Sequence, residues 1–78
     1  MAKRIIHYSF RKAFDKLTLG DGRAVRAEII EVLGDVSAAR FYQIRRDYPN
    51  IPAYIKQEIE QIFLKYGVSE SEIWEIWE

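Results

Sequence analysis

The sequence predicts an all-α fold, a compact bundle of about five short helices, because apolar residues recur at helical spacing along most of the chain. Gly or Pro residues separate successive apolar stripes. The 78 residues, of which 49% are hydrophobic, suffice for one small domain and not for several. We therefore expect a single helical domain over residues 1–78.

The first half of the chain contains two predicted helices. Four apolar residues from Phe10 to Leu17 stand at i, i+3, i+4 and i+7, which indicates a helix over roughly residues 8–18. Gly20-Asp21-Gly22 interrupts this pattern and predicts a turn. A second helix is expected at about residues 23–33, because Gly34 directly follows its last apolar residue.

The second half contains three more predicted helices. Ser37 is a suitable N-cap for a third helix, which Pro49 and Pro52 bring to an end. Apolar spacing predicts a fourth helix from Pro52 to Gly67. Ser69 and Glu72 match a capping box, which predicts a C-terminal helix at about residues 69–77.

Charge is distributed unevenly although the net charge is zero. Residues 1–26 carry seven basic and two acidic side chains, whereas residues 47–78 carry two basic and seven acidic ones. Such asymmetry points to a polyanionic partner or to charge-steered association, although small proteins often distribute their charge unevenly.

Few residues suit catalysis or metal binding. His7 is the only histidine and the chain has no cysteine, so a metal site or a His-activated nucleophile lacks its usual partners. We expect His7 on the surface, no enzyme activity, no cofactor and no small-molecule substrate. No apolar run is long enough to span a membrane, and the N-terminus lacks a secretory pattern, so we expect a cytoplasmic protein.

The helix, Gly, turn and helix between residues 23 and 47 predict a helix-turn-helix. Apolar Val36, Phe41 and Ile44 would hold its second helix against the first, leaving polar side chains outward. Gln can pair with adenine and Arg with guanine in the major groove of DNA. The candidate base-reading residues are Ser37, Ala39, Arg40, Tyr42, Gln43 and Arg46.

The segment Leu33-Gly34-Asp35-Val36-Ser37-Ala38-Ala39-Arg40-Phe41 resembles the lambda-repressor-like helix-turn-helix domains of phage and bacterial regulators. The resemblance covers roughly residues 8–66, although Asp35 makes the turn one residue longer than usual. It implies a regulator of transcription, of phage or mobile-element type, that binds double-stranded DNA. Candidate contacts to the DNA backbone are Lys3, Arg4, Arg11, Lys12, Arg23, Arg26 and Arg45.

Two interpretations of the tail remain open. Trp residues are enriched at interfaces and helix-turn-helix proteins commonly bind DNA as dimers, so Ile73, Trp74 and Trp77 are candidates for a homodimer seam. The same residues would alternatively pack on the domain's own core. The alternative function is a small protein-interaction module, an adaptor or antitoxin-like partner that does not bind nucleic acid.

Overall fold

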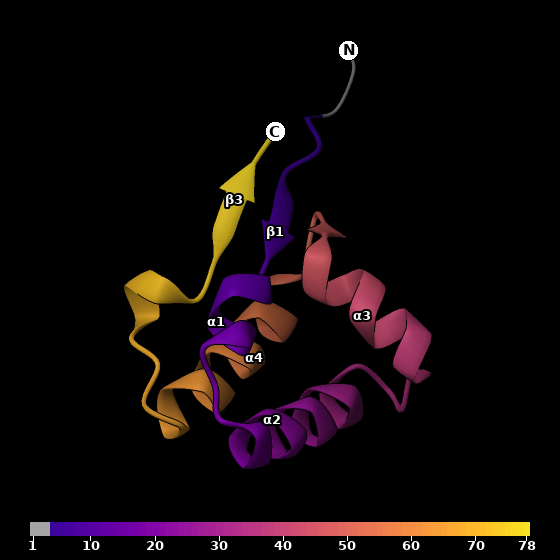
Figure 1. The fold of residues 1–78 in the computed structure, drawn as a ribbon. Helices are drawn as coiled ribbons and strands as arrows, with labels where there is room; N and C mark the ends of the chain where they lie inside the picture. Colours follow the sequence, from indigo (N-terminus) through magenta and orange to yellow (C-terminus); the bar gives the residue numbers. More distant parts are fainter. Residues whose placement is uncertain (1–3) are drawn as a thin grey trace.

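The fold combines helices with a small antiparallel sheet (Figure 1). The computed structural model describes residues 4–78. The prediction of an all-α bundle of five helices is wrong, because the fold of these residues is α+β. Its elements are β1 (His7–Ser9), α1 (Arg11–Asp15), α2 (Leu19–Val32), α3 (Ala38–Arg46), β2 (Tyr48–Pro49), α4 (Ala53–Lys65), the 3-10 turn η1 (Glu70–Glu72) and β3 (Glu75–Trp77).

The sheet joins the two ends of the described chain to its middle. Its strand order is β2-β1-β3, with His7 paired to Trp77 on one side and to Pro49 on the other. Asn50, in a left-handed conformation with φ 51°, extends the pairing of β1. Its backbone N–H donates to the Ile6 carbonyl (2.8 Å), and its side-chain oxygen accepts from the Ile6 N–H (3.0 Å).

The predicted first helix over residues 8–18 is replaced by β1 followed by the short α1. The backbone groups of His7–Ser9 form hydrogen bonds in the sheet, and the Phe10 N–H donates to the Arg45 carbonyl (3.2 Å). The apolar spacing was nonetheless informative for α1, since Ala13 is fully buried and Phe14 packs against the core. Helix therefore begins only at Arg11, where these tertiary hydrogen bonds end.

Helix α2 begins at Leu19, four residues before its predicted start. The Thr18 side chain accepts from the Asp21 N–H (3.2 Å) and caps the helix, while the Asp21 carboxylate suits the positive end of the helix dipole. The predicted turn at residues 20–22 is therefore wrong, because the cap outweighs the low helix propensity of two glycines.

The predicted positions of α3 and α4 are confirmed. Ser37 caps α3 by accepting from the Arg40 N–H (3.2 Å). Pro52 stands at the N-cap of α4 in an extended conformation, one position before the predicted first turn. Gly67 follows α4 with φ 85°, and the Val68 N–H donates to the Phe63 carbonyl (3.1 Å), which closes the helix end.

The predicted C-terminal helix over residues 69–77 is wrong. Ser69 and Glu72 do interact, the hydroxyl donating to the carboxylate at 2.6 Å, but they close a single 3-10 turn, η1. The chain then extends as β3 and pairs with β1. Ile73, between η1 and β3, is 1% exposed and anchors the C-terminal segment in the core. Pairing of β3 with β1 provides hydrogen bonds for the backbone groups that follow Ile73.

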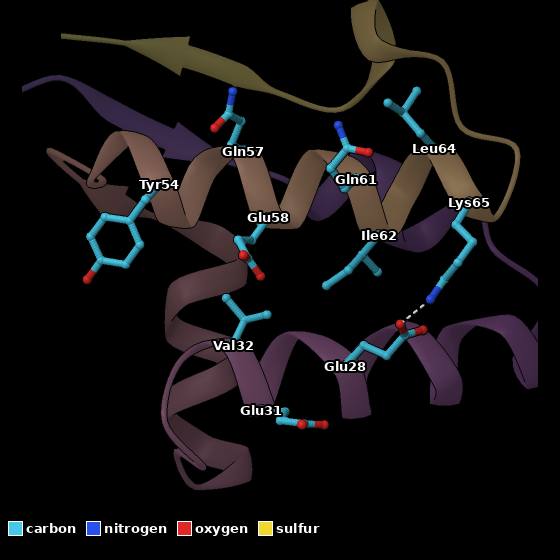
Figure 2. A pocket seen from close by; sticks show the side chains of 10 residues that line it. All are labelled: Glu28, Glu31, Val32, Tyr54, Gln57, Glu58, Gln61, Ile62, Leu64 and Lys65. Atoms are coloured by element: carbon cyan, nitrogen blue, oxygen red, sulfur yellow. Dashed lines mark hydrogen bonds and ion pairs between the residues drawn. The ribbon is translucent and has the colours of Figure 1, made fainter.

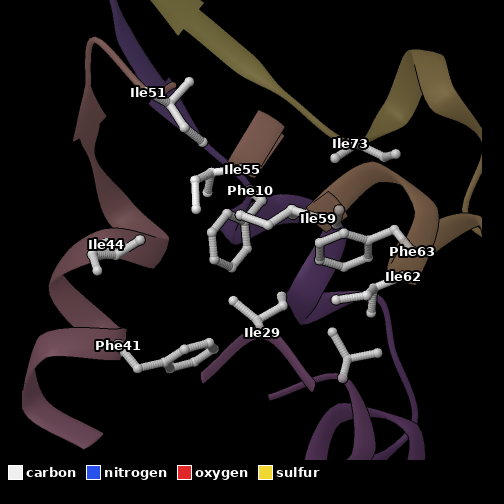
Figure 3. Close-up of a cluster of buried hydrophobic side chains, with 12 residues drawn as sticks. Phe10, Ile29, Phe41, Ile44, Ile51, Ile55, Ile59, Ile62, Phe63 and Ile73 are labelled. Carbon is white, nitrogen blue, oxygen red and sulfur yellow. The ribbon is translucent and has the colours of Figure 1, made fainter. Parts of the chain in front are cut away.

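Phe10 stands at the centre of the core, between the helices and the sheet (Figure 3). Its ring centroid lies 6.1 Å from Phe41, 5.7 Å from Phe63 and 5.9 Å from Trp74. The core thus ties α3, α4 and the C-terminal segment to the residue that follows β1. The other buried hydrophobic residues are Ala13, Val25, Ile29, Ile44, Ile51, Ile55, Ile59, Ile62 and Ile73.

Candidate nucleic-acid interface

The turn between α2 and α3 is built from two left-handed residues. Gly34 has φ 86° and Asp35 has φ 59°. Their N–H groups donate to the Glu31 carbonyl (3.1 Å) and the Ile30 carbonyl (2.9 Å), the pattern of a Schellman motif. The residue that lengthens this turn thus has a defined role, because Asp35 satisfies a carbonyl at the end of α2.

The buried side of α3 fixes which residues face outward. Phe41 and Ile44 are buried in the core, so the helix cannot rotate without exposing them. The Arg40 guanidinium donates to the Gln43 side chain (3.4 Å), one turn along the exposed side. The structure places all six candidate base-reading residues in exposed positions: Ser37, Ala39, Arg40, Tyr42, Gln43 and Arg46.

Arg45 points inward, unlike its neighbour Arg46. Its side chain is 19% exposed and pairs with the Asp15 carboxylate at 3.3 Å. The guanidinium carbon also lies over the rings of Tyr42 (5.0 Å) and Phe14 (5.6 Å). Arg45 therefore connects α3 to α1, an arrangement that leaves little of the cation for a phosphate.

Three basic residues of the N-terminal segment, Arg4, Lys12 and Lys16, pair with acidic residues of the C-terminal segment. Lys12 lies 3.4 Å from Glu75, and Lys16 lies 2.7 Å from Glu72. Antiparallel pairing of β1 with β3 brings these segments together, so part of the charge asymmetry of the sequence is compensated within one chain. Of the other backbone candidates, Arg4 pairs with Glu78, Arg11 is near Asp15, and Lys3 lies outside the described residues.

Four arginines on α2 and α3 remain available. Within residues 4–78, no carboxylate lies at ion-pair distance from Arg23, Arg26, Arg40 or Arg46. Arg26 donates to the Tyr42 hydroxyl (3.4 Å) across the gap between the two helices. Arg23, Arg26 and Tyr42 also line a hollow of about 460 Å³. Uncompensated positive charge therefore adjoins the exposed side of α3.

The candidate dimer residues are largely occupied within the chain. Ile73 is buried, and the Trp74 indole N–H donates to the Glu60 carboxylate (2.8 Å). Trp77 stacks on His7, with centroids 5.3 Å apart, yet remains 42% exposed. The neighbouring Ile76, 57% exposed, is the other large apolar side chain exposed on β3.

His7 is a structural residue that sequence analysis placed on the surface. It is half-buried, and its Nδ1 lies 2.9 Å from the Asp47 carboxylate. Together with the Trp77 stack, this contact joins β1 to both of its flanking segments. No sequence spacing pointed to either partner, because both depend on strand register.

The face of α2 remote from α3 carries a separate charged network. The Glu28 carboxylate accepts from Lys65 Nζ and from the Tyr66 hydroxyl (2.9 Å). The hydrogen bond from Lys65, followed by that from Tyr66, lowers the pKa of Glu28, while the hydrogen bond to Glu28 raises the pKa of Lys65. A hydrogen bond from Lys16, followed by one from Ser69, lowers the pKa of Glu72.

Comparison with protein-family models, curated proteins and solved structures gives no match for this chain. No helix within residues 4–78 is long and apolar enough to cross a membrane. The same residues contain no group of three or more His, Asp or Glu side chains arranged to hold a metal ion.

Proposed function

We propose that this protein binds double-stranded DNA through α3 and acts as a regulator of transcription. The observation that carries the proposal is a group of four arginines around the exposed side of α3 that have no carboxylate partner in the described part of the chain. By contrast, ion pairs within the chain neutralise Arg4, Lys12 and Lys16 near the N-terminus. Clustered positive charge beside an exposed helix is the electrostatic footprint of a nucleic-acid-binding domain.

The position of each arginine and of Gln43 determines the contact to DNA that we assign to it. Arg40 and Gln43 lie one turn apart on the exposed side of α3, and Arg46 continues that side toward the helix end. These side chains would meet base edges in the major groove, where Arg pairs with guanine and Gln with adenine. Arg23 and Arg26 on α2 would contact phosphates and so set the register of the protein on the duplex.

DNA titration tests this proposal. A labelled mixed-sequence duplex is titrated with protein at about 50 and about 200 mM salt, and we expect much weaker binding at the higher salt. Substituting Arg40→Ala together with Arg46→Ala should weaken binding at least about tenfold, because both removed charges lie at the proposed contact.

The matched control is Lys12→Ala together with Lys16→Ala. This variant removes the same net charge, but from residues already paired with carboxylates, so long-range electrostatics change equally in the two variants. We expect the control to bind nearly as tightly as the unmodified protein. Equal losses in both variants, or absence of binding at low salt, would refute the proposal.

We also propose that the protein binds DNA as a homodimer joined along β3. One edge of β3 is unpaired, whereas the other sheet edge, β2, is two residues long and contains Pro49, which blocks pairing. Ile76 and Trp77 offer exposed apolar surface beside the unpaired edge. Sedimentation should show a dimer that Ile76→Lys converts to monomer, while Leu19→Lys, at a 76% exposed residue of α2, leaves it intact. A monomer in the unmodified protein would contradict this arrangement.

A further inference from the structure

We propose that the groove between α2 and α4 binds a basic amphipathic helix of another protein. The proposal goes beyond DNA binding and concerns a separate surface. The groove is open to solvent, has a volume of about 1090 Å³ and shares no lining residue with the hollow beside α3. Its walls combine apolar side chains with two glutamates, Glu31 and Glu58, that pair with no basic residue within residues 4–78.

The apolar part of the groove lies between the two helices (Figure 2). Val32 of α2 and Ile62 of α4 point toward each other across it, and Ile62 continues into the buried core. Tyr54, 69% exposed, lies at one end of the groove, and Leu64, 42% exposed, lies on the side of α4 that is turned away from α2. Apolar surface of this kind, bordered by polar side chains, is typical of a site for a partner's apolar stripe.

The charge of the groove specifies the sign of its occupant. Three glutamates line it, and the one lysine, Lys65, already pairs with Glu28. Glu31 and Glu58 are exposed, and no cation of the described chain lies at ion-pair distance from either. Complementarity therefore favours Lys or Arg on the partner, and it disfavours the phosphates of a nucleic acid.

The dimensions favour a helical partner. The lining residues of α4 run from Tyr54 to Lys65, about 17 Å along the helix axis, whereas those of α2 run only from Glu28 to Val32, about 6 Å. The span along α4 accommodates about three turns of a partner helix, with apolar residues at i, i+3, i+4 and i+7 facing Val32 and Ile62. Basic residues on either side of that stripe would then reach Glu31 and Glu58.

A synthetic helical peptide serves as the probe. Leucines form one stripe of the peptide and lysines the remainder, and a matched peptide carries glutamate in place of every lysine. Backbone amide shifts of the 78-residue chain are recorded during titration. We expect the lysine peptide to shift residues around Val32, Tyr54 and Ile62, and the glutamate peptide to shift none of them.

Two variants test the charge and the apolar contributions separately. Glu31→Lys together with Glu58→Lys should weaken binding of the lysine peptide at least about tenfold, while Glu70→Lys together with Glu78→Lys, which reverses the same charge outside the groove, should change it little. Tyr54→Ser should weaken binding severalfold without disturbing the core, because the side chain is exposed.

Several outcomes would overturn the proposal. Shifts centred on η1 or β3, equal binding of the two peptides, or equal losses in the groove variant and its control would each show attraction unrelated to the groove. Shifts around Val32 that grow with protein concentration and without peptide would assign the groove to a second copy of this chain. Any of these results combined with Arg40-dependent DNA binding would leave the proposed function intact.

Discussion

Substitution of the two adjacent arginines in α3 should affect the melting temperature of the protein differently. We expect Arg45→Ala to lower the melting temperature and Arg46→Ala to leave it almost unchanged, although each removes one positive charge from the same helix turn. The difference arises because Arg45 is 19% exposed in its side chain and packs against α1, whereas Arg46 is exposed.

The magnitude for Arg45 follows from its contacts. Its cation lies over two aromatic rings, each contact contributing about 0.5–1 kcal/mol, and its ion pair with the half-exposed Asp15 adds about 0.5 kcal/mol. Opposing these, the buried Nε has no hydrogen-bond partner, which costs about 1 kcal/mol. The net stabilisation is about 1 kcal/mol, equivalent to about 4–8 °C in a domain of this size.

Thermal unfolding followed by circular dichroism measures this difference, and DNA titration of the same samples supplies the second readout. Arg46→Ala should weaken DNA binding at an unchanged melting temperature. Arg45→Met, which retains the apolar stem, should recover part of the loss seen for Arg45→Ala. Equal melting temperatures for the two alanine variants would refute the structural role of Arg45.

Three further perturbations have defined outcomes. The pKa values of Glu28 and Glu72 are lowered in the folded state, so these carboxylates stabilise the fold fully above the pKa of Glu in the unfolded chain, about 4.3. In acid unfolding, the free energy of unfolding should fall as the pH drops through the pKa values of the two carboxyls in the folded protein. Phe10→Ala should cost about 3–5 kcal/mol in urea unfolding, since the ring is fully buried among three aromatic neighbours; a loss below about 1 kcal/mol would contradict its central position. Gly34→Ala should cost about 1–2 kcal/mol because φ is 86° there, although its Cβ would meet no atom within 4 Å, and an unchanged urea midpoint would contradict this conformation.

The middle of the chain was predictable because its signals are local. Ser37 caps α3 by accepting a hydrogen bond from the backbone N–H of Arg40, three residues along the chain, and Gly34 and Gly67 end helices by adopting positive φ. Each of these effects depends on residues within about one helical turn. The exposed side of α3 followed from the same spacing, since burying Phe41 and Ile44 decides where the remaining side chains point.

The sheet was not predictable from such signals. Ser69 and Glu72 interact as a capping box suggests, but the same contact closes a 3-10 turn equally well, and the following residues extend because β1 offers them a partner. That partner lies at the far end of the chain. The inward position of Arg45 likewise depends on Asp15 and Phe14, whose approach follows from tertiary packing rather than from spacing.

Pairing of β1 with β3 has a consequence for the order of folding. Helix α2 packs chiefly on α4, while α3 packs on β1 and β2. The contact between α2 and α4 closes a shorter stretch of chain than the pairing of β1 with β3, which closes a loop that includes nearly the whole chain. Loop closure of this kind carries an entropic cost that is met only after local contacts have formed. We therefore expect the contact between α2 and α4 to form early, with β3 docking last and opening first. Amide hydrogens of β3 should accordingly exchange with solvent ahead of those in α4, so that the strand carrying the proposed dimer edge is also the least protected part of the sheet.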